Sequence, residues 1–185
     1  MKDLGTVLLE TDRLILRKIK KEDAYQAFEN WTNDELVTRY VTWNPHKNVE
    51  NTLKLFEIWE NNYEMEHTYK WIVELKNTGE VIGTIDVVRK NIEQKTAEIG
   101  YCYGSKYWNK GYGTEALKKV LDFLFNEVGF ELIYARHVID NVGSGRVMEK
   151  AGLIYEATLK YRWVDKITGK RTHLKVYSKL KDGII

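Results

Sequence analysis

The sequence predicts one α+β domain built around a mixed, mostly antiparallel β-sheet. Short runs that alternate apolar and polar residues are typical of strands, and stretches with apolar residues at helical spacing separate them. In the middle of the chain a strand, a glycine loop, a helix and a second strand follow one another, and such a crossover makes its two strands parallel neighbours. The chain has 185 residues, a single proline at Pro45 and no repeat or linker, so one domain over residues 1–185 accounts for it.

The first half of the chain supplies strands and two helices. Apolar alternation predicts strands at residues 13–17, 71–75 and 81–88, with a turn at 77–79 between the last two. A helix is predicted to begin near Lys21. Asn48 is a good N-cap for a second helix, in which Leu53, Phe56 and Trp59 share one stripe. This stripe suits core packing first, with a part in a binding pocket as the alternative.

The second half contains the crossover unit and ends in two further strands. Strands are predicted at residues 97–103, 132–136, 155–163 and 174–180. An apolar stripe predicts a helix over residues 114–128, with Gly129 as its stop. Ser144 is expected to start a short helix that ends at Gly152.

Composition argues against several kinds of protein. The net charge of +2, from 29 basic and 27 acidic residues, gives no overall field that favours nucleic acid, so no direct nucleic-acid partner is expected. Cys102 is the single cysteine and fits a reducing compartment. No segment resembles a signal peptide or a membrane span, so we expect a cytoplasmic protein without a membrane partner. The four histidines, His46, His67, His137 and His173, lack metal-ligand spacing, so no metal is expected.

Gly111 and Gly113 form a short glycine loop before a predicted helix. The first turn of a helix has unpaired N–H groups and a dipole that favours anions, and glycine lets a phosphate approach the backbone. The loop is not a P-loop, since no Lys followed by Ser or Thr opens the helix, and Ala116 replaces the third glycine of a dinucleotide loop. Two interpretations remain, a phosphate site and a plain helix entry.

Four separated motifs resemble the GNAT superfamily of acetyl-CoA-dependent N-acetyltransferases. They are Ala97-Glu98-Ile99-Gly100-Tyr101, Trp108-Asn109-Lys110-Gly111-Tyr112-Gly113-Thr114-Glu115-Ala116, Asn141 with Ser144, and Glu149-Lys150-Ala151-Gly152-Leu153. They occur in the order and spacing of that family. The opening Glu10-Thr11-Asp12-Arg13-Leu14-Ile15-Leu16-Arg17 is similar to the ribosomal-protein-alanine N-acetyltransferase (Rim-type) branch. The superfamily usually has Gln or Arg at the position of Trp108, where the Rim-type branch commonly has an aromatic residue.

The resemblance implies a GNAT-like fold in which the central parallel strands splay apart, flanked by helices, to admit acetyl-CoA. The backbone of Ile99, Gly100 and Tyr101 would then bind the pantetheine arm. The pyrophosphate would bind the loop formed by Trp108, Asn109, Lys110, Gly111, Tyr112, Gly113 and Thr114. Asn141 would bond the arm, and Ser144 would bond the thioester sulfur and help to protonate the departing thiolate. Local alternatives are a turn role for Asn141, an N-cap role for Ser144 and plain solvent exposure for Lys110.

Acetyl transfer needs a neutral amine, and the kind of amine decides how much help it needs. An α-amine has a pKa of about 7.7–8.0, whereas deprotonating a lysine with a pKa of about 10.4 at pH 7 costs about 4.6 kcal/mol. Glu98 is the best candidate for a catalytic base, with an outward-facing strand carboxylate as its alternative. Part of the Rim-type branch has an acidic residue in the segment that matches Tyr161-Arg162-Trp163, which has none.

These inferences predict an acetyl-CoA-dependent N-acetyltransferase that acts by direct attack in a ternary complex. A protein N-terminal α-amine is the first candidate acceptor. A small amine, such as an antibiotic, a polyamine or an amino-acid derivative, is the alternative, and a non-catalytic acyl-CoA-binding sensor is a third. The acceptor pocket is expected to include Trp31, Tyr40, Trp43, Trp59 and the late strands. The protein is expected to be a monomer or a homodimer.

Overall fold

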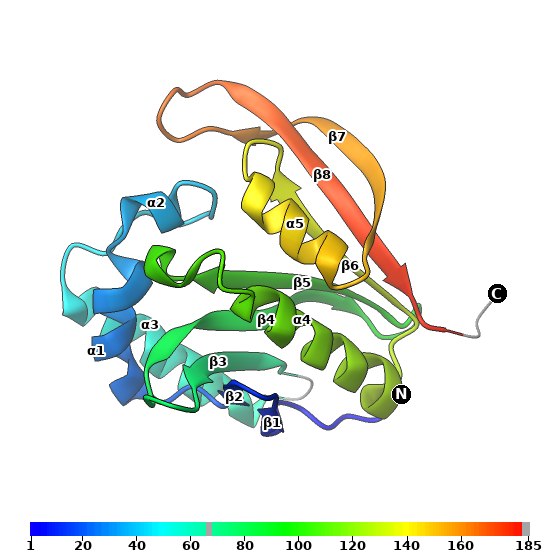
Figure 1. Cartoon of the computed structure of the whole chain (residues 1–185), viewed down its shortest axis with the longest axis horizontal. Coiled ribbons are helices and arrows are strands. Elements are labelled where there is room, and N and C mark those ends of the chain that lie inside the picture. The colour runs from blue at the N-terminus through cyan, green and yellow to red at the C-terminus, as the bar shows by residue number, and fades with distance from the viewer. Residues whose placement is uncertain (66–67, 183–185) are drawn as a thin grey trace.

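A computed structural model of the chain describes residues 1–65 and 68–182, and His67 lies outside these residues. Within them, eight strands form one sheet in the order β1-β2-β3-β4-β5-β6-β8-β7 (Figure 1). The strands are β1 (Leu9–Glu10), β2 (Leu14–Arg17), β3 (Lys70–Leu75), β4 (Val81–Asn91), β5 (Thr96–Tyr103), β6 (Leu132–Val138), β7 (Ile154–Val164) and β8 (Arg171–Leu180).

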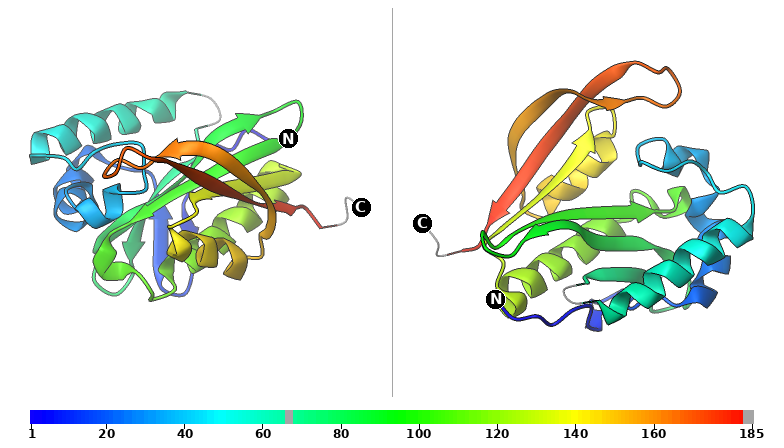
Figure 2. Two further views of the ribbon diagram at one scale, coloured as in Figure 1. Left: turned by 90° about the horizontal axis from the view of Figure 1, so that it is seen from above. Right: turned by 180° about the vertical axis from the view of Figure 1, so that it is seen from behind.

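Helices cover both faces of this sheet. Figure 1 shows α4 and α5 on one face, and the view from behind in Figure 2 shows α3 crossing the other. The helices are α1 (Ala24–Ala27), α2 (Glu35–Thr38), α3 (Val49–Asn61), α4 (Tyr112–Asp122) and α5 (Val142–Lys150), with π-helical turns at Phe28–Thr32 and Phe123–Val128 and 3₁₀ turns at Lys21–Asp23, Asn62–Glu64 and Ser105–Tyr107. The β7–β8 hairpin extends from the sheet beyond α5.

The predicted sheet is confirmed. Among the strands of the described residues β5 and β6 are the parallel pair, and all other neighbours are antiparallel. The sequence did not predict the short elements β1 and α2. The helix expected near Lys21 is divided into 3₁₀, α and π turns.

Two helix starts differ from the prediction. The helix expected over residues 114–128 begins at Tyr112, because Gly111 with φ of +83° is the last non-helical residue, and its final turns are π-helical. Gly129, with φ of +97°, ends it as predicted. The next helix begins at Val142 rather than Ser144, because the Asn141 side chain caps it and accepts the Ser144 N–H.

Two apolar clusters hold the layers together. The larger lies between the sheet and α4, where Leu117, Val120 and Leu124 are fully buried against Ile99 and Ile133. The smaller joins α1 and α3 to the other face through Trp31, Phe56 and Ile72. Burial of these side chains is the main stabilising contribution, at roughly 1.5–3 kcal/mol for each large one.

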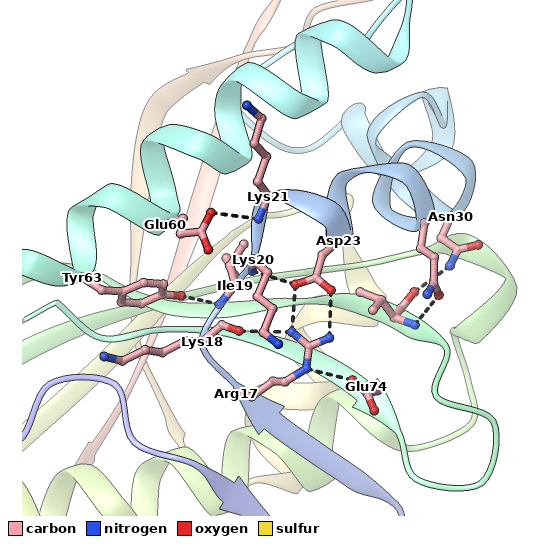
Figure 3. A network of polar contacts seen from close by, with 12 residues as sticks. Arg17, Lys18, Ile19, Lys20, Lys21, Asp23, Asn30, Glu60, Tyr63 and Glu74 are labelled. Carbon is pink, nitrogen blue, oxygen red and sulfur yellow. Dashed lines mark hydrogen bonds and ion pairs between the residues drawn. The ribbon is translucent and has the colours of Figure 1, made fainter.

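A polar network fixes the first helical turns to the sheet (Figure 3). Arg17 donates from both terminal nitrogens to the carboxylate of Asp23 at 2.8 Å, and from Nε to Glu74 at 2.8 Å. These two carboxylates raise the pKa of Arg17 further above its ordinary value. The Tyr63 hydroxyl accepts the Ile19 N–H at 2.8 Å. β2, β3 and the turn before α1 are thereby held in one position, and this fixes the start of the segment that leads to α2.

Candidate active site

The site begins where β5 and β6 separate. They pair only over residues 96–99 of β5 and 132–135 of β6. Beyond these residues β5 remains paired with β4, and β6 with β8. The facing edges of residues 100–103 and 136–138 therefore have no strand partner, and their backbone groups can bind an extended ligand.

A cavity of about 610 Å³ lies at this separation, between α2, the glycine loop and α5. Nine of the predicted cofactor-binding residues line it, namely Tyr101, Trp108, Asn109, Gly111, Tyr112, Gly113, Thr114, Asn141 and Ser144. Ile99, Gly100 and Lys110 are not among the lining residues. The structure thus brings most of the predicted set around one space, and the role of each residue stays a prediction.

The glycine loop has the backbone geometry of an anion site. Asn109 and Gly111 have positive φ angles of 60° and 83°. No side chain of the described residues caps the N-terminus of α4, so the first N–H groups of that helix remain available. Arg146 and Lys150 of α5 line the same cavity and add positive charge. Sequence reasoning did not single out Arg146.

A brace from the start of the chain holds this loop. Arg13 donates from Nη1 to the carbonyl of Lys110 at 3.0 Å and from Nε to Glu115 at 2.7 Å. Thr11 donates its hydroxyl to the same carboxylate at 2.5 Å. These contacts and the buried position of Glu115 act on its pKa in opposite directions, with a net lowering. A Cβ at Gly111 would lie 3.4 Å from Arg13, so the brace also leaves little room for a side chain there.

Tyr101, Ser144 and Asn141 lie together at the separation of the strands. The Tyr101 hydroxyl lies 2.9 Å from Ser144 Oγ and donates to the Ser144 carbonyl at 2.9 Å. Burial raises the pKa of Tyr101, and its bond to Ser144 opposes this in part. Because Asn141 is the N-cap of α5, the N-cap interpretation of Ser144 is wrong and its hydroxyl is directed to Tyr101 instead.

The structure places Glu98 apart from these residues. Its side chain is 5% exposed on the paired part of β5, outside the cavity lining. Arg136 donates from Nε to one carboxylate oxygen at 2.7 Å, and Arg89 lies 3.9 Å from the other. The ion pair with Arg136 and the position outside the cavity lining favour a structural role for Glu98, and its catalytic role stays a prediction.

The far end of the cavity is formed by α2 and the segment after it. Val37, Tyr40 and Val41 line this end, and Cys102 faces it from β5. The aromatic residues expected here divide between site and core. Tyr40 lines the cavity, whereas Trp31 is buried in the smaller cluster, and Trp43 and Trp59 pack against that cluster.

The β7–β8 loop contacts the segment after α2, but no residue of this loop or of the late strands is among the described residues that line the cavity. Lys166 donates to the backbone carbonyl of Thr38 at 3.1 Å and to that of Trp43. Arg39 of the same segment lies 4.0 Å from Asp165. Residues about 125 positions apart are thereby joined beside this end of the cavity, and the views in Figures 1 and 2 agree on this approach.

Covalent and metal chemistry find little support in the described residues. Burial, with the nearby Asp86 and Asp34, raises the pKa of the Cys102 thiol to about 12, so it stays protonated at neutral pH and is a weak nucleophile. Across residues 1–65 and 68–182 no group of three or more His, Cys, Asp or Glu side chains is placed to hold a metal ion. Nor does any helix in these ranges have the length and apolarity to cross a membrane.

Comparisons with known proteins agree with this geometry. Residues 13–154 match the acetyltransferase (GNAT) domain. The uncharacterized N-acetyltransferase YoaA of Bacillus subtilis is 34% identical over 153 residues, which cover 83% of this chain and 86% of YoaA.

Solved structures of acetyltransferases share the fold. A GNAT acetyltransferase from Bacillus anthracis has a TM-score of 0.82 at 27% identity, over 95% of this chain and 99% of that one. The ribosomal-protein-S5-alanine acetyltransferase from Vibrio fischeri has a TM-score of 0.77 at 22% identity, over 96% and 98%. The microcin C7 self-immunity acetyltransferase MccE, in complex with acetyl-CoA and AMP, has a TM-score of 0.79 at 20% identity, over 92% and 93%. The chain belongs to the GNAT family of acetyltransferases.

Proposed function

We propose that this acetyltransferase transfers the acetyl group of acetyl-CoA to a primary amine, and that its first acceptor class is the α-amine of a protein N-terminus. The observation that carries the proposal is the single cavity. It joins the glycine loop, where anions are favoured, to the α2 end, where an acceptor can enter. The reacting groups would meet between these ends, beside Tyr101 and Ser144.

The residues present fit acetyl-CoA. The positive φ of Gly111 and the uncapped start of α4 suit the pyrophosphate, and a Cβ at Gly113 would approach the Tyr103 ring to 3.3 Å. Arg146 and Lys150 add charge for the phosphates, and the free edge of residues 100–103 suits the amide groups of the arm. When bound, acetyl-CoA supplies an activated acyl thioester.

The two hydroxyl groups suit a proton donor for the departing thiolate. Tyr101 has a raised pKa and so keeps its proton at neutral pH. Ser144 Oγ lies 2.9 Å from it, so a proton that Ser144 gives to the thiolate can be replaced from Tyr101, and the proton that the attacking amine loses on forming the amide restores Tyr101. A hydrogen bond from Ser144 to the thioester sulfur would become stronger as negative charge develops on the sulfur. An interaction that is stronger in the transition state than in the ground state accelerates the reaction.

The charge of the cavity favours an α-amine over a lysine side chain. Of the described residues that line the cavity, Asp140 alone has a carboxylate. At pH 7 an α-amine needs about 1 kcal/mol for deprotonation and a lysine about 4.6 kcal/mol. A site with a single exposed carboxylate suits the acceptor that needs less help from a base.

A small amine is the second candidate. The similar structures include MccE, a microcin self-immunity enzyme, as well as a ribosomal-protein acetyltransferase. The Lys166 contacts hold the segment that supplies Tyr40 and Val41 to the acceptor end, and a pocket with a fixed wall also suits a compact substrate.

An acceptor screen with thiol release as its readout tests the proposal. Peptides with free N-termini, the same peptides with blocked N-termini and a retained lysine, and small amines are compared at saturating acetyl-CoA. N-terminal peptides are expected to be the best substrates. Faster turnover of blocked peptides or of small amines would transfer the assignment to that class, and no turnover of any amine would favour an acyl-CoA-binding sensor.

Ser144→Ala tests the proton donor in the same assay. Turnover should fall by about ten-fold or more while acetyl-CoA affinity changes little, which is the mark of an interaction made in the transition state. The melting temperature should stay nearly constant, because Asn141 rather than Ser144 caps the helix. Ser178→Ala on β8 is the control, and a Ser144→Ala variant with wild-type turnover would remove this role.

A further inference from the structure

The β7–β8 hairpin carries a strong positive charge that the whole-chain balance conceals. Residues 160–181, here called the basic hairpin, contain eight lysine and arginine residues and one acidic residue, a net charge of +7. The whole chain has a net charge of +2, so the remaining residues together carry −5. Such a separation of charge is a feature of surfaces that attract a partner of opposite sign.

Within residues 1–65 and 68–182, no acidic side chain forms an ion pair with the eight basic residues of this surface. The one carboxylate, Asp165, is 8% exposed and accepts from the backbone of Ile167 and Thr168 in its own loop. The basic hairpin therefore presents its field to solvent.

A bulge directs part of this charge outward. β7 and β8 pair at Leu159 with Leu174 and next at Trp163 with Thr172, so three residues of β7 face only His173 between them. Two of the three, Lys160 and Arg162, are exposed, and Lys170 is exposed in the loop. Bulges commonly redirect side chains in this way, and none of these three side chains has a hydrogen-bond partner among the described residues.

The basic hairpin stands beside the acceptor end of the cavity. Lys166 in its loop bonds the carbonyls of Thr38 and Trp43, and the segment between them supplies Tyr40 and Val41 to the cavity. Figure 1 shows the hairpin loop rising on the same side as α2. If the N-terminus of a polypeptide occupies the acceptor end, its following residues extend along α2 or along the basic hairpin.

We infer that the basic hairpin binds acidic residues in the acceptor polypeptide, a few positions after its reacting N-terminus. This inference rests on the proposed protein acceptor. An acidic polypeptide fits the surface better than RNA, because bases need free aromatic faces for stacking. The two exposed tyrosines of the β7–β8 hairpin, Tyr155 and Tyr161, are each held in a T-shaped contact, with Tyr177 and His173, rather than set side by side as a stacking platform.

The test compares two peptides that share the N-terminal residues preferred in the acceptor screen. One carries four glutamates at positions 4–7, and its twin carries four glutamines there. kcat/KM is measured for the wild type and for two triple variants. The hairpin variant combines Lys160→Gln, Arg162→Gln and Lys170→Gln. The control variant combines Lys2→Gln, Lys47→Gln and Lys54→Gln. These control lysines are exposed, lie off the hairpin and form no ion pair within the described residues.

The glutamate peptide should be favoured by about ten-fold in the wild type and in the control, since three exposed charge contacts add modestly. The preference should disappear in the hairpin variant, and should weaken steeply with added salt because exposed charges are screened. Acetylation of the glutamine peptide should be equal in all three proteins.

Four results would overturn the inference. Equal use of both peptides by the wild type would end it and leave the N-terminal acceptor intact. A preference that survives in the hairpin variant would place the acidic contact elsewhere. Binding of a labelled uridine oligomer that the hairpin variant loses, without any peptide preference, would identify RNA as the partner. If neither peptide is acetylated, the proposed protein acceptor fails and the inference fails with it.

Discussion

Gly145 in α5 lies close to the His137 side chain of β6, with no room for a Cβ between them. A Cβ built there would lie 2.8 Å from Nε2 and 3.1 Å from Cε1 of His137. The imidazole has little freedom to withdraw, because it is 6% exposed, its Nδ1 lies 2.7 Å from the Val138 carbonyl, and the Tyr177 ring lies 5.6 Å away. In Gly145→Ala the helix has to move instead, and Ser144 moves with it.

Two opposing effects set the size of the change. Alanine is a better helix former than glycine by about 1 kcal/mol. Overpacking of a close contact costs about 1–3 kcal/mol. The net expectation is a loss of about 1 kcal/mol, which lowers the melting temperature of a domain of this size by about 2–4 °C. In a His137→Ala background the clash is absent, so the same substitution should become stabilising by up to about 1 kcal/mol.

Denaturant unfolding of the four proteins in this cycle measures the change of sign. Gly143→Ala is the matched control in the same helix, since its Cβ would meet only Asn141 Oδ1, at 3.9 Å, and it should stabilise or leave stability unchanged. Thermal shifts with acetyl-CoA measure whether displacement of α5 weakens binding. Gly145→Ala as stable as wild type, or equally destabilising with and without the imidazole, would refute the reasoning.

Three further outcomes are expected. Arg13→Met should weaken acetyl-CoA binding several-fold in calorimetric titrations, because the glycine loop loses its brace; unchanged affinity would contradict the brace. Lys166→Met should raise the KM for the acceptor several-fold, because the segment after α2 loses its two bonds to Lys166, while the affinity for acetyl-CoA stays constant. Lys166→Arg should restore the wild-type KM. Lys170→Gln should leave the KM for a neutral peptide unchanged. Burial lowers the pKa of His137, so the unfolded chain binds its proton first and the free energy of unfolding should fall as the pH drops below about 6.5. Urea titrations at about pH 7.5 and 5.5 measure this fall, which His137→Asn should reduce; an equal fall in both proteins would contradict it.

Local patterns predicted the parts of the site that depend on one stretch of backbone. The loop at Gly111 requires a positive φ, and the sequence shows that requirement directly as a glycine before a helical stripe. The exact helix start was harder, because Asn141 and Ser144 are both good caps. The structure selects Asn141, while the hydroxyl of Ser144 contacts that of Tyr101.

Local sequence patterns could not predict contacts between side chains that are far apart in the sequence. Alternation places Glu98 on a face of β5, but the residue opposite it on β6 depends on the register of the sheet. Arg136 meets the carboxylate only because residues 96–99 pair with 132–135. Arg13 and Glu115 likewise meet across about 100 residues, and neither residue alone differs from an ordinary surface charge.

The two ends of the cavity also differ in how far short sequence motifs encode them, and this difference affects which residues can specify the acceptor. The glycine loop and the start of α5 present backbone N–H groups and caps that short motifs encode. The acceptor end is lined by α2 and the segment after it, and Lys166 of the β7–β8 loop holds that segment through two backbone carbonyls. Any residue offers a carbonyl, so this junction constrains little of the sequence around it. Residues of α2 and of the β7–β8 loop can therefore change in charge and size while acetyl-CoA binding is preserved. In this chain the β7–β8 loop and its flanking strands have become strongly basic, as the basic hairpin shows.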